Sequence, residues 1–344
     1  MVVFFSCESA NDHSLFEKDT LDKNRIEKKQ KGVHVFGRID STTNLKPFVA
    51  TNFEWITLVP WSHQKDYNSP TINHYRGDSL ERIKRDAAWK TKIELVHNSG
   101  LKVFLKPHVW IFHPSDNKWR SEIYPTSEKN WNEWKKNYRE FILRYAKIAA
   151  ETDVELFCIG TELTRLTLEK TDYWLTLIEE VRKIYPGKIT YAANWYKEYE
   201  NISFWGQLDY IGIQAYFPLV KKDYPTSKEI SEGWKKHIPK IEAIYDKYNR
   251  KILFTELGYK STPDSATEPW AWLDYENLDE ARHSYETQSH CYQAFFNSIW
   301  NKEWFVGVHL WQMRSDYIDN NQIDLDFTPQ GKPALKIISE GFNK

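Results

Sequence analysis

Eight short apolar runs alternate with longer helical patterns along this chain, and that alternation constrains the fold more than any other feature. Most of the runs are continuously apolar, as strands buried on both faces of a parallel sheet are. They occupy residues 32–37, 54–60, 101–107, 154–160, 188–193, 208–216, 251–257 and 305–311. The order of the runs predicts an α/β fold built on a parallel sheet.

Amphipathic helices are predicted between these strands, at residues 78–100, 129–150, 172–185, 227–248 and 279–300. Eight strands, each followed by a crossover, are typical of a (β/α)8 TIM barrel in a single domain. An open, doubly wound sheet is the alternative. That fold usually carries a glycine-rich phosphate turn after its first strand, and the sequence contains neither a G-x-G-x-x-G motif nor a P-loop.

The 344 residues suffice for one large barrel. We assign residues 31–344 to the catalytic barrel and residues 1–30 to an N-terminal tail. The tail opens with MVVFFSC, which resembles the end of a bacterial lipoprotein signal but lacks its basic region. Two interpretations stay open: a secreted, periplasmic or cell-surface protein anchored through a lipid on Cys7, or a chance match in a cytoplasmic protein.

Charge and cysteine content exclude several classes of partner. Lys and Arg number 47 against 48 Asp and Glu, a balance without the basic excess that nucleic acid or an anionic membrane would require. No apolar run reaches the ~18 residues needed to span a membrane. The three cysteines have no metal-ligand spacing. We therefore expect a monomer with no metal, no organic cofactor, no nucleic-acid partner and no transmembrane span.

Aromatic residues make up 16% of the chain, and 16 of them are tryptophans. Indole rings offer flat apolar faces that match the C–H face of a sugar ring. The surplus therefore favours a carbohydrate cleft, although tryptophans also fill cores and helix faces.

The candidate site residues lie where strands end, because TIM barrels carry their active sites at the carboxyl ends of the strands. The strand ends supply mainly carboxylate, aromatic and amide side chains, with no Ser–His–Asp arrangement and no phosphate cradle. One further candidate, Trp270, lies in a long loop after the seventh strand. The strand-end candidates are Trp61, His108, Trp110, Glu162, Asn194, Trp195, Tyr216, Glu256, Tyr259 and Trp311.

Two of these residues, Glu162 and Glu256, follow or end the fourth and seventh strands, which lie on opposite sides of an eight-stranded barrel. Hydrolysis of a glycosidic bond needs two carboxyl groups flanking the bond, about 5–5.5 Å apart in a retaining enzyme. One must be protonated and the other ionised, and Tyr216 is a candidate donor to the ionised one. The sequence pattern leaves open which glutamate has which role.

Three other candidates have structural alternatives. His108 is either a site residue or a neutral core histidine bonded to backbone. Trp311 is either a platform for a sugar ring or part of the barrel floor. Trp270 either contributes to binding or pins down its loop.

From about Gly32 to the end, the chain resembles the clan A glycoside hydrolases, and most of all glycoside hydrolase family 113. The matching motifs are ITLVPW, KPHVW, IGTELT, FTELGYKS followed by EPWAW, VGVHLWQM and FTPQGKPA. The resemblance implies a retaining enzyme acting on β-1,4-mannan or manno-oligosaccharides. It implies Glu162 as acid/base and Glu256 as nucleophile, and His108, Tyr216 and Trp311 match supporting positions.

The chain departs from the clan pattern at Thr161, where many members have Asn. A contact to the sugar 2-hydroxyl must then come from elsewhere, and Asn194 is a candidate. Two other functions remain open at this point. One is a β-mannosidase or β-glucanase of the same clan, and the other is a carbohydrate-binding barrel without activity.

Overall fold

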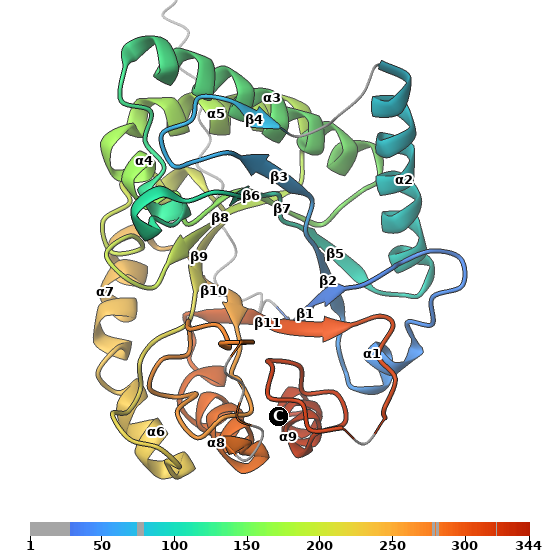
Figure 1. Cartoon of the computed structure of the whole chain (residues 1–344), viewed down its shortest axis with the longest axis vertical. Helices are drawn as coiled ribbons and strands as arrows, with labels where there is room; N and C mark the ends of the chain where they lie inside the picture. The colour runs from blue at the N-terminus through green and yellow to red at the C-terminus, as the bar shows by residue number, and fades with distance from the viewer. Residues whose placement is uncertain (1–27, 74–78, 277–278, 280–281, 321) are drawn as a thin grey trace, which may run out of the picture.

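Eight parallel strands close into a barrel in the computed structural model of the chain, which describes residues 28–73, 79–276, 279, 282–320 and 322–344 (Figure 1). Neighbours in the barrel follow chain order, and pairing of the first strand with the last closes the ring. The predicted TIM barrel is confirmed. The barrel strands are β1 (Gln30–Phe36), β2 (Trp55–Leu58), β5 (Lys102–Leu105), β7 (Leu156–Thr161), β8 (Lys188–Asn194), β9 (Tyr210–Gln214), β10 (Ile252–Leu257) and β11 (Phe305–Arg314).

Most of the proposed tail, including Cys7, lies outside the described residues. Within the described part of the chain, every helix is too short or too polar to cross a lipid bilayer.

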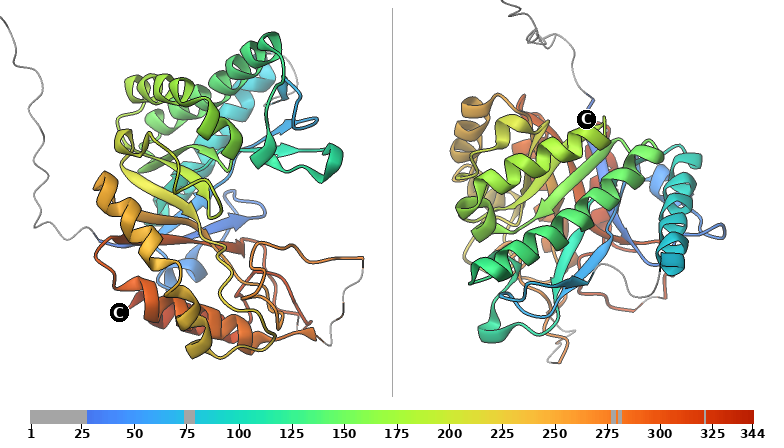
Figure 2. Two further views of the ribbon diagram at one scale, coloured as in Figure 1. Left: turned by 90° about the vertical axis from the view of Figure 1, so that its left-hand side faces the viewer. Right: turned by 90° about the horizontal axis from the view of Figure 1, so that it is seen from above.

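Helices cover the barrel on the outside (Figure 2), and buried side chains fill its inside. Seven of the strands contribute to an inner cluster of Trp55, Phe104, Leu156, Cys158, Ala192, Tyr210, Leu253 and Val306. The outer faces of the strands pack against the helices in a second, larger core. The helices are α1 (Lys46–Ala50), α2 (Ser79–Asn98), α3 (Glu128–Glu151), α4 (Thr164–Glu169), α5 (Thr171–Ile184), α6 (Ser227–Trp234), α7 (Ile238–Tyr248), α8 (Tyr285–Phe295) and α9 (Pro333–Phe342).

Two predicted helices differ from the observed ones. The helix predicted at residues 227–248 is two helices, α6 and α7, that break at residues 235–237. Pro239 lies in the first turn of α7, where its missing N–H is tolerated, but it could not continue a helix from α6. The helix predicted at 279–300 begins later, at Tyr285, where Ser284 caps the Thr287 N–H, and it ends in a π-helical turn over Phe296–Trp300.

A second, three-stranded sheet, not predicted from the sequence, extends the barrel wall on one side. It consists of β3 (Trp61–Gln64), β6 (His108–Ile111) and β4 (Ile72–Asn73), in the order β4-β3-β6. Pro60 separates β2 from β3, and Pro107 separates β5 from β6. Because proline cannot donate to a ladder, both strands break at the same level and their second halves pair with each other outside the barrel ring.

Candidate active site

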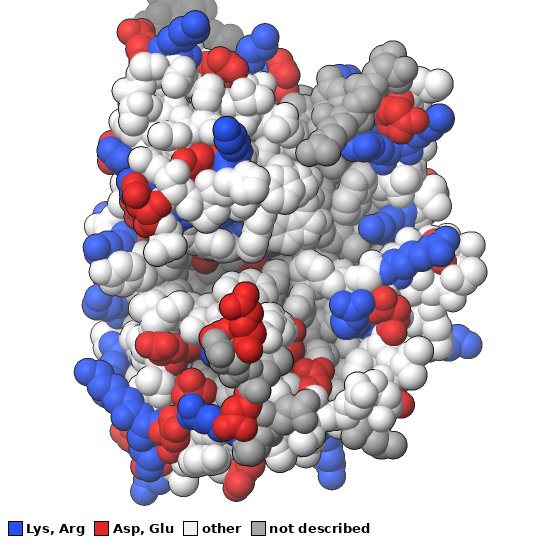
Figure 3. Space-filling model, in the orientation of Figure 1, with Lys and Arg blue, Asp and Glu red and all other residues white. Residues whose placement is uncertain are grey.

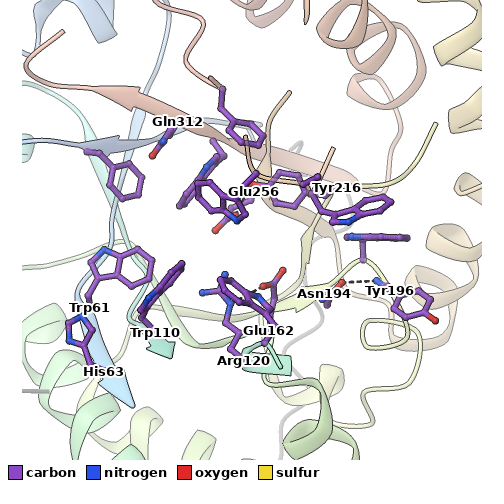
Figure 4. A pocket seen from close by; sticks show the side chains of 18 of the residues that line it. Trp61, His63, Trp110, Arg120, Glu162, Asn194, Tyr196, Tyr216, Glu256 and Gln312 are labelled. Atoms are coloured by element: carbon purple, nitrogen blue, oxygen red, sulfur yellow. Dashed lines mark hydrogen bonds and ion pairs between the residues drawn. The ribbon is translucent and has the colours of Figure 1, made fainter. Parts of the chain in front are cut away.

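A cavity of about 1020 Å³ opens at the carboxyl ends of the barrel strands, where this face of the molecule is hollowed near its centre (Figure 3). Its walls are mostly aromatic, and seven of the lining residues are tryptophans. The polar lining residues are His63, Arg120, Glu162, Asn194, Glu256 and Gln312. Glu162 and Glu256 project toward each other from opposite walls (Figure 4).

Nine of the eleven candidate residues line this one cavity: Trp61, Trp110, Glu162, Asn194, Trp195, Tyr216, Glu256, Trp270 and Trp311. His108 lies just beneath it, almost fully buried. The structure does not bring Tyr259 to the cavity. Its side chain is 1% exposed and packs edge-on against Tyr292.

Glu256 lies in β10 and is held by two donors. The Tyr216 hydroxyl donates to its Oε2 at 2.9 Å, as expected from the sequence, and the Lys106 ammonium is in direct contact with its Oε1. Burial and the neighbouring carboxylate raise the pKa of Tyr216 well above its usual value, so this hydroxyl keeps its proton as a donor. Both donors favour the ionised carboxylate.

Glu162 directly follows β7 and faces Glu256 across the cavity. Its backbone has φ of 51°, in the left-handed region that costs a non-glycine residue about 1–2 kcal/mol. This conformation turns the chain sharply out of the strand toward α4 and leaves the side chain at the cavity wall. Arg120 Nε donates to Glu162 Oε2 at 2.9 Å.

Two buried histidines beside Glu256 are neutral. Burial, together with the nearby Lys106, lowers the pKa of both His34 and His108 well below the usual value. Arg120 Nη1 donates to His108 Nδ1 at 3.4 Å, which leaves the ring proton on Nε2, 3.9 Å from Glu256 Oε1. His108 is therefore buried, as in its structural alternative, yet it contacts side chains of the site rather than backbone.

A third carboxylate, Glu198, lies fully buried behind the cavity wall. Its oxygens accept hydrogen bonds from the hydroxyls of Tyr191, Thr164 and Thr167 and from the Asn194 N–H, at 2.7–3.0 Å. Burial raises the pKa of Glu198 to about 7. Glu198 thus joins the end of β8 to helix α4, which follows Glu162.

The aromatic walls form separate clusters around the two carboxylates. On the side of the extra sheet, Trp110 packs edge-on against Trp61 and Trp119, with ring centroids 5.8 and 5.0 Å apart. On the other side, Trp195 and Trp270 lie 5.0 Å apart at an angle of 30°. Trp311 is 6% exposed and packs edge-on against Phe36, so it belongs to the cavity wall rather than to the barrel floor.

Sequence reasoning missed the cationic residues of the site, Lys106 and Arg120. Lys106 occupies the carboxyl end of β5, the position at which a barrel residue reaches the site, and this was the available signal. Arg120 lies in a short 3-10 helix (Arg120–Glu122) within a long loop, and its spacing to Glu162 carries no motif. Among the described residues, no cluster of His, Cys, Asp and Glu could hold a metal ion.

The fold and the site define the class of this protein. A TIM barrel whose fourth and seventh strands bring carboxylates to one aromatic cavity is the arrangement of a clan A glycoside hydrolase. The model of Glycoside Hydrolase Family 113 matches residues 31–332, so the chain belongs to that family and is a glycoside hydrolase.

Solved structures of the same family are similar over nearly the whole chain. Two GH113 β-1,4-mannanase structures, one of them a complex, are 26% identical and cover 92% of this chain and 99% of their own, with TM-scores of 0.77 and 0.76. The GH113 β-mannanase AaManA from Alicyclobacillus acidocaldarius, in complex with ManMIm, is 25% identical, covers 92% of this chain and 97% of its own, and has a TM-score of 0.74. A comparison with curated proteins found no match.

Proposed function

We propose that this glycoside hydrolase cleaves β-1,4-linked mannan or manno-oligosaccharides with retention of configuration, using Glu256 as the nucleophile and Glu162 as the acid/base. The observation that carries the proposal is the pair of carboxylates facing each other across one cavity. The assignment of β-1,4-mannan as the substrate rests on the similarity to GH113 β-1,4-mannanases at 25–26% identity.

The assignment of roles rests on the different surroundings of the two carboxylates. Glu256 is in contact with an ammonium and a hydroxyl that both stabilise its ionised form, as a nucleophile requires. Glu162 has one side-chain hydrogen-bond partner among the described residues, Arg120, and lines the open cavity, where it can exchange protons with a leaving group and with water.

In the first step a Glu256 oxygen attacks the anomeric carbon and forms a C–O bond as the glycosidic C–O bond breaks. Protonated Glu162 gives its proton to the departing oxygen. In the second step a water molecule attacks the anomeric carbon and gives its proton to Glu162. The bond to Glu256 then breaks, and its electron pair returns to the carboxylate. Two inversions give a product with the original β configuration.

The aromatic clusters support endo action on a chain of several sugars. Tryptophans lie on both sides of the carboxylate pair, and several rim rings are half exposed, so that sugar units could stack on either side of the cleaved bond. Exposed fractions are 41% for Trp270, 49% for Trp272 and 50% for Phe112. A β-mannosidase would need only one of the two sides.

Replacement of each carboxylate tests the roles. Glu256→Ala and Glu162→Ala should each reduce kcat on β-1,4-manno-oligosaccharides roughly 1000-fold or more while the fold is kept. With an activated aryl β-mannoside, azide should rescue Glu162→Ala and give a β-mannosyl azide, because azide needs no general base. Near-normal turnover by either variant would refute the assignment.

Defined oligosaccharides distinguish the remaining candidates. We expect internal cleavage of mannopentaose and mannohexaose, with the product anomer read as β by NMR. Release of single terminal mannose units would indicate a β-mannosidase, and preferential cleavage of glucan oligomers a β-glucanase. Binding without turnover, unchanged in Glu162→Gln, would indicate a non-catalytic barrel.

A further inference from the structure

Lys106 is a fully buried lysine in contact with Glu256, at the end of β5 and beneath the cavity. It is 0% exposed and does not line the cavity, so it does not contact substrate. Removing an ammonium from water is costly, and a barrel interior would be filled more favourably by an apolar side chain. A lysine kept at this position therefore needs an explanation other than packing.

The partners of Lys106 hold its Nζ in one place. An ammonium has three protons to donate. They are taken up by Glu256 Oε1, by Gln214 Oε1 at 2.9 Å, and by His34 Nε2 and the Thr255 carbonyl, both at 3.4 Å. His34 can accept because its Nδ1 faces the Leu310 carbonyl at 3.2 Å, which places the ring proton there. The surroundings are thus built for the charged form of the lysine.

Lys106 is in direct contact with one carboxylate, Glu256, whereas the histidines and the thiol around it carry no charge. The three histidines near it are neutral, because burial lowers the pKa of each well below the usual value, and burial raises the pKa of the Cys158 thiol to about 11. Burial also lowers the pKa of Lys106, and the Glu256 carboxylate opposes that change. Arg120 pairs with the other carboxylate. The titratable groups that face Lys106 are His34, His108, Cys158, Glu162, Glu256 and His309.

We propose that Lys106 is a positioning residue that acts through Glu256: its ammonium keeps the carboxylate ionised and fixed in the free enzyme and stabilises it again as the leaving group of the second step. This inference rests on the proposed role of Glu256 as nucleophile.

The reaction cycle explains why a cation suits this position. When Glu256 forms its bond to the anomeric carbon, the carboxylate becomes a neutral ester and Lys106 loses its counter-charge. When water attacks and the C–O bond to Glu256 breaks, the electron pair returns to a carboxylate that already faces the ammonium. The same contact therefore favours the ionised nucleophile before attack and its departure afterwards.

The test is the pH dependence of kcat/KM on 2,4-dinitrophenyl β-mannobioside, whose good leaving group makes the rate depend little on acid assistance. In Lys106→Met, Glu256 loses its counter-ion and should be protonated at higher pH. We expect the acidic limb of the profile to move up by about one pH unit or more and kcat/KM on that limb, at pH 5, to fall roughly tenfold or more as a result. Lys106→Arg, which keeps the charge, should keep the limb near its original position.

Lys29→Met is the matched control. Lys29 is a half-buried lysine just before β1, at the opposite end of the barrel, and its Nζ donates to the carbonyls of Lys302 and Phe305. This variant should retain the wild-type profile. A folded Lys106→Met with an unmoved acidic limb would overturn the proposal for Lys106, whereas a wild-type enzyme inactive on every β-mannoside would overturn the proposed function itself.

If Lys106→Met does not fold, the melting temperatures of two other variants test the same pair. Glu256→Gln leaves the ammonium buried without its counter-ion and should lower Tm, and the double variant Lys106→Met/Glu256→Gln should recover most of that loss. Recovery would support a coupled pair. A Tm of Glu256→Gln equal to that of the wild type, or a double variant less stable than Glu256→Gln, would contradict it.

Discussion

Arg120 places a guanidinium beside the carboxylate that we propose as the acid/base. Its Nε donates to Glu162 and its Nη1 to His108, and its guanidinium carbon lies 4.9 Å from the centre of the Trp119 ring. Contacts on three sides fix both the arginine and the Glu162 oxygen that it holds. Orientation of an acid matters most when the leaving group departs poorly without a proton.

Arg120→Met should therefore affect substrates unequally. We expect kcat on manno-oligosaccharides, whose leaving group is a sugar alkoxide, to fall roughly 30- to 100-fold. With 2,4-dinitrophenyl β-mannobioside, whose leaving group needs no proton, the loss should be only a few-fold. Steady-state kinetics on both substrates measure the ratio. Equal losses would mean that Arg120 acts on binding or on the fold rather than on proton transfer.

At the scale of single residues, the strand pattern fixed which candidate side chains reach the cavity. Glu162, Asn194, Tyr216 and Glu256 were found because each lies at the end of a recognisable barrel strand. Tyr259 lies as far past the end of β10 as Tyr216 lies past the end of β9, yet it does not line the cavity. The direction of a side chain after a strand depends on a loop conformation that no local pattern encodes.

Among the elements, α4 and the end of β8 are held together by Glu198. Four donors converge on this carboxylate, and Tyr191, one of them, also accepts from the Leu163 N–H. The contact links the segment directly after Glu162 to the cavity residue Asn194. Loss of Glu198 should weaken the packing of both α4 and the end of β8.

The raised pKa of Glu198 predicts a specific pH dependence of stability. The folded state keeps a proton up to about pH 7, whereas the unfolded chain releases it near 4.5, the ordinary pKa of a glutamate. The contribution of this group to stability is therefore full at acidic pH and is lost as pH rises through 7, by up to a few kcal/mol. In Glu198→Gln, urea denaturation at pH 5 and pH 8 should show a correspondingly smaller loss between the two.

Glu229→Gln provides the control, because Glu229 caps α6 at the surface and its pKa is lowered to about 2 by hydrogen bonds from Thr226 and by Lys222. Its stabilising contribution is present above the unfolded value and is lost only as pH falls toward 2. Between pH 5 and pH 8, this variant should follow the wild type. A Glu198→Gln protein with an unchanged loss over that interval would contradict the assignment.

The continuous apolar runs located all eight barrel strands, but the smaller sheet was missed because a proline interrupts each of the two runs that form it. The predicted strands, 54–60 and 101–107, end at Pro60 and Pro107. Each run continues past its proline as a second strand, because the N–H of His108 bonds to the Pro60 carbonyl at 2.9 Å and the ladder resumes. The pairing of two distant segments, 61–64 and 108–111, stabilises these short strands, and β3 also pairs with β4.

For the molecule as a whole, the part of the chain that matches the family is the part that forms the barrel and its cavity. The family match begins at residue 31, and the first barrel strand begins at Gln30. Folding into a closed ring is what brings residues 94 positions apart, Glu162 and Glu256, to one cavity. The chemistry is therefore a property of the closed barrel and not of either segment alone.

Because many tryptophans line the cavity, the fluorescence of the enzyme should report whether a glycan is bound there. Seven of its 16 tryptophans line this single space, and several are partly open to water. A bound glycan should dehydrate them and move their emission to shorter wavelength. In Glu256→Gln, titration with mannopentaose should produce a saturable blue shift without product formation, and cellopentaose at equal concentration should produce much less. A longer oligosaccharide that covers one more tryptophan should therefore give a larger blue shift, which is measurable without a label.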